Sequence, residues 1–257
     1  MARKGARLGQ HFLTHAWAAR KLAYAVTPRP GETILEIGPG KGVLTKELLA
    51  LGSVVAIEKD EKLVEKLHET FAEDIASEKL KIVSADIRDV TPERLGLDNY
   101  VLAANIPYYI TGEIIRQFLT AEVQPRAMAL LVQKEVAQRV VDTKESILSL
   151  SVKAYGTPKV IAKVRKPHFS PPPSVDSAIL LIDNISRKFF ADISEDNFFK
   201  VVRTGFASKR KMLVNNLLSL SQKADVLHAL NACSIAKNTR AEKVSLEEWR
   251  CLTKRLS

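Results

Sequence analysis

Between residues 30 and 135, short apolar runs alternate with stretches whose apolar residues recur every three or four positions. A buried strand, an amphipathic helix and another strand form the βαβ unit, which builds parallel sheets. Five apolar runs are present, and strands are expected at residues 33–37, 53–57, 80–83, 100–104 and 128–132. This alternation predicts an α/β fold around a parallel sheet.

Helices are expected within this region at residues 41–51 and 60–76, and Asp60 is placed to cap the second helix. From about residue 186 the pattern changes to helical periodicity alone. It covers residues 196–207, 209–220, 222–230 and 245–256. The sequence therefore predicts two domains: residues 1–185, with the sheet and a basic N-terminal arm, and residues 186–257, a small all-helical domain.

Composition excludes several classes of protein. Hydrophobic residues make up 46% and charged residues 26%, as in ordinary globular chains, and no apolar run reaches the roughly 18–20 residues of a membrane span. The two cysteines, Cys233 and Cys251, exclude a disulfide scaffold and a structural zinc site, and the five histidines show no metal-ligand spacing. No secretory signal or heptad repeat is present, so a soluble, cytoplasmic monomer without metal is expected.

The net charge of +10 is distributed unevenly. Residues 1–29 hold six basic and no acidic side chains, residues 30–152 hold 14 basic and 20 acidic, and residues 153–166 hold five basic and no acidic. Residues 183–257 hold 14 basic and 8 acidic side chains. Basic flanks around an acidic middle favour a polyanionic partner, although basic termini are also found simply solvated.

Polar signals follow four of the predicted strands, at the edge where open α/β sheets bind ligands. They are the glycine loop 38–42, Glu58, Asp86 and Asn105. The loop has the spacing Gly-x-Gly-x-Gly rather than the dinucleotide Gly-x-Gly-x-x-Gly, which favours a nucleoside without a pyrophosphate. Glu58 is placed to accept ribose hydroxyls, and Asp86 an adenine amino group. Either acid alone is also compatible with a helix cap or a solvated loop.

Asn105, Ile106, Pro107 and Tyr108 form the most specific motif. An aromatic amino nitrogen is a poor nucleophile because its lone pair is delocalised into the ring. The Asn105 side-chain oxygen and the Ile106 carbonyl are predicted to accept its two N–H groups and to localise that pair. Tyr108 is predicted to stack on the base. The alternative, without a catalytic role, is a junction between a strand and a turn, where Asn-x-Pro is common.

Several motifs, in order, resemble those of the S-adenosylmethionine-dependent rRNA adenine dimethyltransferases. They are Gly9-Gln10-His11-Phe12-Leu13, the segments 36–42 and 105–108, the segment 169–177, and the C-terminal segments 206–217 and 240–245. The resemblance implies a Rossmann-like S-adenosylmethionine-dependent methyltransferase sheet with a small C-terminal all-helical domain. It is closest to the bacterial small-subunit branch, which dimethylates two adjacent adenines in the 3′-terminal hairpin of small-subunit rRNA.

The resemblance also implies roles for single residues in holding the cofactor. His11 and Leu13 would border S-adenosylmethionine, Gly38 would face its methionine part, and Asn105 would face both cofactor and target. Glu58 would hold the ribose and Asp86 the adenine. At His11 this chain departs from the many family members that carry Asn, and a neutral imidazole can still form a hydrogen bond there.

On the RNA side, Phe169 is expected to contact the target base opposite Tyr108, or else to be a core aromatic that anchors the proline turn. Phosphate contacts are expected from the N-terminal arm and from two basic groups. One group is Lys209, Arg210 and Lys211 at the start of a helix, and the other is the segment 153–166 with Arg165 and Lys166.

The expected function is methyl transfer to N6 of adenine in small-subunit rRNA, with that rRNA or an immature small subunit as partner. Three alternatives remain at this point. A nicotinamide-dependent dehydrogenase would share the sheet but leaves the motif 105–108 unexplained. A ribosome assembly factor that only binds RNA would not need Glu58, Asp86 and Asn105. A large-subunit rRNA dimethyltransferase of the macrolide-resistance type would differ mainly in the RNA that it accepts.

Overall fold

The computed structural model describes residues 11–256, and the chain divides into two compact units. The first unit consists of the residues up to Ala137 together with Thr157–Ile185, and the second of Gln138–Gly156 together with the residues from Ser186 onward. One border coincides with the change of pattern near residue 186. The segment 138–156, expected in the first domain, lies in the second unit because Leu150 and Ala154 pack into its core. No helix among residues 11–256 is long and apolar enough to cross a membrane.

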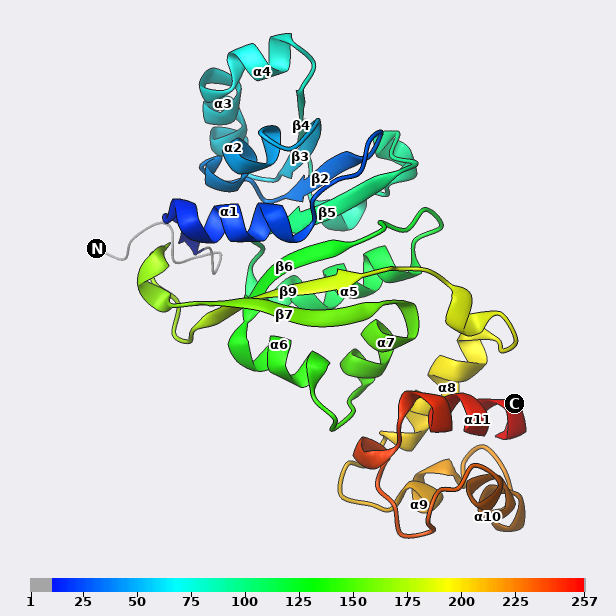
Figure 1. Cartoon of the computed structure of the whole chain (residues 1–257). Coiled ribbons are helices and arrows are strands. Elements are labelled where there is room, and N and C mark those ends of the chain that lie inside the picture. Colours follow the sequence, from blue (N-terminus) through cyan, green and yellow to red (C-terminus); the bar gives the residue numbers. More distant parts are fainter. Residues whose placement is uncertain (1–10, 257) are drawn as a thin grey trace. The chain divides into compact units, whose positions relative to one another are not determined.

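The first unit is built on a seven-stranded sheet with the order β4-β3-β2-β5-β6-β9-β7 (Figure 1). The predicted parallel sheet is confirmed in the first five of these strands, and β9 runs antiparallel to both β6 and β7. Their bounds are β2 Thr33–Ile37, β3 Val54–Glu58, β4 Leu80–Ser84, β5 Tyr100–Ala104, β6 Met128–Gln133, β7 Thr157–Val164 and β9 Ser177–Asp183. A separate pair joins β1 (Phe12–Leu13) to β8 (Phe169–Ser170).

The strands β7 and β9 are absent from the sequence prediction. β7 forms one edge of the sheet, so its side chains are mostly exposed and include Lys159 and Lys163, which hide the apolar alternation of a strand. A register irregularity between Val160 and Ala162 shifts the pattern further. An edge strand with lysines is a common protection against pairing with another chain.

Helices cover both faces of this sheet. In Figure 1, α1 crosses the front of the sheet and α5 lies behind it. Small buried residues on α1, such as Ala19 and Ala23, let it pack closely against β6, β7 and β9. The helix bounds are α1 Ala16–Ala25, α2 Val43–Leu49, α3 Glu61–Thr70, α4 Ala72–Ala76 and α5 Thr111–Thr120; α6 (Lys134–Val141) contains the border between the units.

The predicted helix 60–76 is two helices, α3 and α4. Asp60 caps α3 as expected, because its carboxylate accepts from the Lys62 N–H at 3.0 Å. The helix ends at Phe71, whose backbone leaves the helical region with φ −115° and ψ 29°. The Phe71 ring is buried and packs over Gly42 with no room for a side chain there. Burial of this ring therefore takes precedence over a continuous helix.

The second unit is helical around a core that includes the fully buried Trp249. Its helices are α7 Ile147–Tyr155, α8 Glu195–Gly205, α9 Leu213–Leu217, α10 Lys223–Ala232 and α11 Leu246–Leu256. Two cysteines cannot make a scaffold of several disulfides, but Cys233 and Cys251 form one bridge, with Cα atoms 5.8 Å apart. This bridge joins the end of α10 to α11.

The expected helix 209–220 begins only at Leu213. Before it, residues 206–211 form turns, and the Asn216 amide donates to the carbonyls of Gly205 and Ser208 at 2.6 and 3.2 Å. These two hydrogen bonds fix the turns, so Lys209, Arg210 and Lys211 precede the helix instead of opening it.

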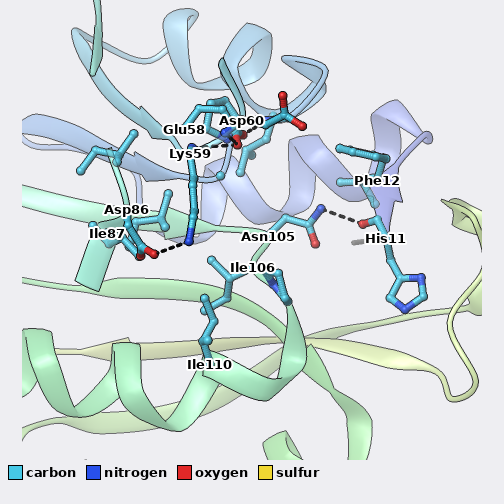
Figure 2. A pocket seen from close by; sticks show the side chains of 18 of the residues that line it. His11, Phe12, Glu58, Lys59, Asp60, Asp86, Ile87, Asn105, Ile106 and Ile110 are labelled. Atoms are coloured by element: carbon cyan, nitrogen blue, oxygen red, sulfur yellow. Dashed lines mark hydrogen bonds and ion pairs between the residues drawn. The ribbon is translucent and has the colours of Figure 1, made fainter. Parts of the chain in front are cut away.

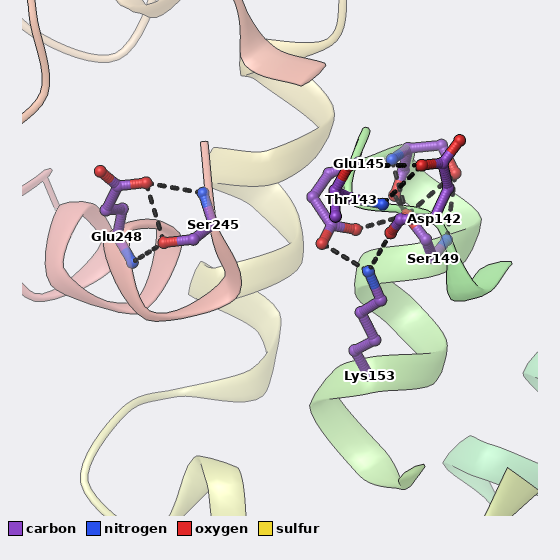
Figure 3. A network of polar contacts seen from close by, with 8 residues as sticks. Asp142, Thr143, Glu145, Ser149, Lys153, Ser245 and Glu248 are labelled. Atoms are coloured by element: carbon purple, nitrogen blue, oxygen red, sulfur yellow. Dashed lines mark hydrogen bonds and ion pairs between the residues drawn. The ribbon is translucent and has the colours of Figure 1, made fainter. Parts of the chain in front are cut away.

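Reciprocal side-chain caps mark the start of two described helices in this unit, α7 and α11 (Figure 3). At α7, the Ser146 hydroxyl accepts from the Ser149 N–H at 3.1 Å and the Ser149 hydroxyl accepts from the Ser146 N–H at 2.7 Å. At α11, Ser245 and Glu248 form the same reciprocal pair. Such capping boxes satisfy N–H groups that the first helical turn leaves unpaired.

We expect Gly205→Ala to destabilise the second unit by about 1–3 kcal/mol, a typical cost of overpacking a core. A Cβ at this position would collide with the buried Trp249 ring and lie 2.8 Å from Leu213 Cδ1. Gly112→Ala in α5 is the matched control, since nothing lies within 4 Å of its Cβ and alanine favours the helix. Urea unfolding measures both, and equal stability of Gly205→Ala and the parent would contradict the packing.

Candidate cofactor and target-base site

A cavity of about 290 Å³ opens at the carboxyl ends of the parallel strands in the first unit (Figure 2). It brings together all four polar signals that follow the predicted strands. The lining residues come from the start of the described chain and from the turns after β2, β3, β4 and β5: His11–Leu13, Gly38–Lys41, Glu58–Asp60, Ala85–Arg88 and Asn105–Ile110. Ligands of open α/β sheets bind at this edge.

The glycine loop approaches the cavity with its backbone. Gly40 has φ +58°, and a Cβ there would lie 2.9 Å from the Phe12 ring. Only glycine therefore combines this conformation with the close approach of the N-terminal segment. The Gly40 N–H donates to Glu58 Oε2 at 3.0 Å, which ties the loop to the end of β3.

Glu58 is the buried carboxylate of the cavity, with 5% of its surface exposed. Its Oε1 accepts from the N–H groups of Lys59 and Asp60 at 2.9 and 3.0 Å. A carboxylate offers about four acceptor positions. Since three are used, Glu58 is oriented by the protein and keeps acceptor capacity for a ribose hydroxyl.

Asp86 lies at the expected place after β4, but its carboxylate is already paired. Lys59 Nζ and Arg88 Nη2 donate to Oδ2 at 2.7 and 2.5 Å, and the Arg88 N–H and Nε donate to Oδ1 at 3.1 and 3.0 Å. All four acceptor positions of this carboxylate are therefore used. Hydrogen bonds from Arg88, followed by those from Lys59, hold the pKa of Asp86 far below its usual range. An adenine amino group would have to displace one of these donors, so the role of Asp86 stays a prediction.

Lys59 and Arg88 are cavity residues that the sequence analysis does not identify. Both are surrounded by acids in the sequence, Lys59 by Glu58 and Asp60 and Arg88 by Asp86 and Asp89. Such alternating charges are typical of a solvent-exposed surface, so they do not indicate a site. The pairing depends on the alignment of β3 with β4, where Glu58 is opposite Ser84. That register brings Lys59 to Asp86, as Figure 2 shows.

Asn105 follows β5 and is held by the N-terminal segment. Its Nδ2 donates to the His11 carbonyl at 3.3 Å, which leaves Oδ1 free to accept. Ile106 is 3% exposed, and among residues 11–256 its carbonyl accepts no hydrogen bond. Asn105 and Ile106 are adjacent in sequence and both line the cavity. Each therefore offers an oxygen acceptor, Asn105 Oδ1 and the Ile106 carbonyl, that has no hydrogen-bond donor among the described residues.

Tyr108 is fixed by contacts at both ends of its side chain. Its hydroxyl is 2.6 Å from Ser177 Oγ, and its ring is stacked on the His11 imidazole with centroids 5.8 Å apart. Burial raises the pKa of the Tyr108 phenol above its usual value. A neutral aromatic ring in a fixed orientation suits the stacking predicted from the sequence.

His11 connects three segments at the cavity rim. Its Nδ1 lies 2.8 Å from the Pro171 carbonyl, while its own carbonyl accepts from Asn105. Leu13 is also at the cavity wall and is 4% exposed. Both residues, with Gly38, lie where contact with a cofactor is expected, whereas Gly9 and Gln10 of the same motif lie outside the described residues.

Phe169 is not at the cavity. It is 4% exposed, lies opposite Leu13 in the β1–β8 pair and belongs to the hydrophobic core of the first unit. A base could not reach this ring without displacing core side chains. This burial agrees with the alternative, a core aromatic next to the proline turn, and the contact with the target base stays a prediction.

The basic side chains outside the cavity differ in whether they are exposed to solvent or bound to other residues of the chain. Lys209, Arg210 and Lys211 are exposed in the second unit, and Arg165 and Lys166 are exposed in the first. Lys153, in contrast, is bound to Glu145 Oε1 and to the Asp142 carbonyl at 2.6 and 2.7 Å (Figure 3). Lys153 is thus committed to a structural contact, and the basic N-terminal arm lies mostly outside the described residues.

Glu36, in the strand before the glycine loop, is fully buried, and neither carboxyl oxygen has a hydrogen-bond partner among the described residues. Burial raises the pKa of Glu36 to about 8, and the Glu58 carboxylate acts in the same direction. The Thr45 hydroxyl opposes this rise. The motif identifies this acid in the sequence, but its burial depends on helices packed over the sheet.

The family described as Ribosomal RNA adenine dimethylase matches residues 1–257. A curated relative from Dehalococcoides mccartyi, "Ribosomal RNA small subunit methyltransferase A", is 43% identical and aligns with 98% of this chain and 87% of its own. Two solved structures, both 24% identical, share the fold. One is a dimethyladenosine transferase from Plasmodium falciparum (TM-score 0.81, 94% of this chain and 96% of that one). The other is the 23S rRNA methyltransferase ErmE (TM-score 0.78, 95% and 99%).

Stability should fall with rising pH because of Glu36. The unfolded carboxyl has a pKa of about 4.3. Between that value and about 8, the folded state holds more protons than the unfolded state. The contribution of Glu36 is therefore complete below about pH 4 and is lost as the pH rises toward 8. Glu36→Gln should flatten this part of the stability profile.

The profile is measured by urea unfolding at several pH values between about 5 and about 8. Glu65→Gln on the exposed face of α3 is the control, because it removes the same charge from a solvated position. A profile of Glu36→Gln that coincides with that of the parent would show that Glu36 is not a buried neutral acid.

Proposed function

The chain belongs to the ribosomal RNA adenine dimethylase family, an S-adenosylmethionine-dependent family. From this premise we propose that it methylates N6 of two adjacent adenines in the 3′-terminal hairpin of small-subunit rRNA. The proposed partner is small-subunit rRNA or an immature small subunit, which would place the enzyme in the cytoplasm. The observation that carries the mechanism is the pair of acceptors without donors, Asn105 Oδ1 and the Ile106 carbonyl, next to the fixed ring of Tyr108.

The cavity fits the cofactor by the chemistry of its lining. Glu58 and Asp60 offer carboxylates after β3, Gly38 and Gly40 bring the backbone close, and Ile87 supplies an apolar wall. When bound, S-adenosylmethionine supplies the methyl group from a positively charged sulfur, which is already a good leaving group. Glu58 would hold the ribose, His11 and Leu13 would border the cofactor, and Gly38 would face its methionine part.

The protein's contribution to catalysis is mainly orientation. Asn105 Oδ1 and the Ile106 carbonyl would accept both N–H groups of the target amine and direct its lone pair toward the methyl carbon. Tyr108, held by Ser177 and His11, would fix the plane of the base. Positioning of this kind supplies a large part of the rate enhancement in transfers between two bound groups. The adenine must leave its stack to enter the cavity, as in other enzymes that modify bases.

The small subunit is favoured over the large subunit by the relative at 43% identity, whose name specifies the small subunit. A structure named as a 23S rRNA methyltransferase and one named as a dimethyladenosine transferase both share this fold, so the fold does not distinguish the two RNA substrates. We assign the second unit to RNA binding, since its exposed Lys209, Arg210 and Lys211 lie together in one turn region with no acid among them.

The function is tested by methyl transfer from labelled S-adenosylmethionine, followed by nucleoside analysis. Small subunits that lack the hairpin modification are compared with naked large-subunit rRNA. We expect dimethyladenosine on the small subunit alone. Label only on large-subunit RNA would overturn the assignment of substrate, and no label on either RNA would overturn methyl transfer.

In the same assay, Asn105→Ala should lower methyl transfer at least about a hundredfold, the usual size of a lost polar contact to the reacting group. RNA binding should stay near that of the parent. Asn99→Ala is the control, because its exposed side chain lies at the other end of β5, away from the cavity. Parent-like turnover in Asn105→Ala would contradict the mechanism.

Replacing Lys209, Arg210 and Lys211 together by Glu should weaken RNA binding and reduce its dependence on salt. Each lost phosphate contact lowers the slope of log K against log salt by about 0.7–0.9. The control with the same change of charge replaces the exposed Lys62, Lys66 and Lys81 of the first unit by Glu. If the two triple variants bind equally well, the 209–211 turn does not contact phosphate.

A further inference from the structure

The outer face of α1 carries two exposed aromatic side chains. Trp17 is 42% and Tyr24 is 56% exposed, and Lys21 lies between them at helical spacing on the same face. The opposite face of α1 is buried in the core. Neither aromatic ring is therefore needed to attach the helix, although large aromatic side chains are usually at least partly covered in folded proteins.

A turn from a distant part of the sequence extends this aromatic face. The His168 ring lies 4.6 Å from the His15 ring and 6.0 Å from the Trp17 ring, measured between centroids. The His168 carbonyl accepts from the N–H and the hydroxyl of Thr14 at 2.9 and 3.0 Å, which fixes the turn against the start of α1. Trp17 thus stands next to the His168 ring, which in turn contacts the His15 ring.

The cations around these rings are available for a ligand. Lys21 and Arg165 are exposed, and neither takes part in an ion pair among residues 11–256. Arg20, on the same helix, is paired with Glu47 at 3.1 Å. Residues 153–166 contain no acid, and the nearby Asp176 carboxylate accepts from the Lys166 N–H at 3.1 Å without an ion pair to Arg165 among the described residues.

This face is continuous with the rim of the cavity. Phe12 and Leu13 pair with Ser170 and Phe169, and this short ladder runs from His11 at the cavity to His15 at the aromatic face. Four extended residues span at most about 14 Å. In Figure 1, the start of α1 and the turn after β7 lie side by side, in agreement with the hydrogen bonds of Thr14.

We propose that this surface, the α1 platform (His15, Trp17, Lys21, Tyr24, Arg165 and His168), binds the unpaired RNA strand next to the target adenine. A base stacks on Trp17, and Lys21 and Arg165 contact the neighbouring phosphates. Aromatic rings interleaved with free cations are the usual elements of single-strand binding. A membrane surface is disfavoured, since a helix that lies on lipid exposes its apolar face, which α1 buries. The inference rests on the proposed function, in which RNA is the substrate.

Intrinsic fluorescence tests the platform directly, because the chain has two tryptophans and Trp249 is fully buried in the second unit. Titration with a short single-stranded RNA should quench the exposed Trp17 component and shield it from acrylamide. Anionic vesicles are the comparison ligand. Unchanged Trp17 emission at saturating RNA, or quenching by vesicles alone, would overturn the proposal.

Kinetics on the small subunit give the second test. Trp17→Ala and Lys21→Glu should each raise KM roughly tenfold, about what one stacked base or phosphate contact supplies, with kcat unchanged. Trp17→Phe should restore most of the affinity because it keeps a stacking ring. Lys66→Glu on α3 is the charge-matched control. KM values equal to that of the parent in both platform variants would overturn the platform alone, whereas an inactive parent enzyme would overturn the proposed function.

Discussion

The site depends on one carboxylate that organises the backbone around it. Glu58 accepts N–H groups from the glycine loop after β2 and from the turn after β3, so two neighbouring strand ends are held at a fixed separation. Hydrogen bonds to a charged acceptor are shorter and stronger than neutral ones, and burial protects them from water. Removing this acid would leave three buried or half-buried donors unsatisfied, in addition to removing the acceptor proposed for the ribose.

A second set of contacts closes the site from the N-terminal side. His11 is bound through its ring to Pro171 and through its carbonyl to Asn105, residues 160 and 94 positions away in sequence. Because the His11 carbonyl accepts from Asn105 Nδ2, the amide is oriented so that its Oδ1 is free to accept another hydrogen bond. The His11 imidazole therefore holds the N-terminal segment, and the carbonyl of that segment holds the Asn105 amide.

The sequence predicts those parts of the fold that depend on local pattern. Each of the five parallel strands contains a short apolar run, and the polar residues that follow them converge because parallel strands end at one edge. Features that depend on tertiary packing cannot be predicted from the local sequence pattern. The pairing of Asp86 with Lys59 requires the register of β3 on β4, the burial of Phe169 requires its partner Leu13, and the break at Phe71 requires Gly42. The edge strand β7 is hidden by its exposed lysines.

The second unit is formed by two segments that are separate in the sequence, and this has a consequence for biosynthesis. Leu150 and Ala154 of α7 are buried against residues such as Phe198 and Leu213, which are translated later. When α7 leaves the ribosome, its apolar face has no native partner, and about fifty residues more must be made before α8 is complete. During this interval the chain exposes an apolar helix between the strands of the sheet. The unit can therefore assemble only after the sheet strands on both sides of α7 have been synthesised, and a chain that ends at residue 185 would keep this helix without a core.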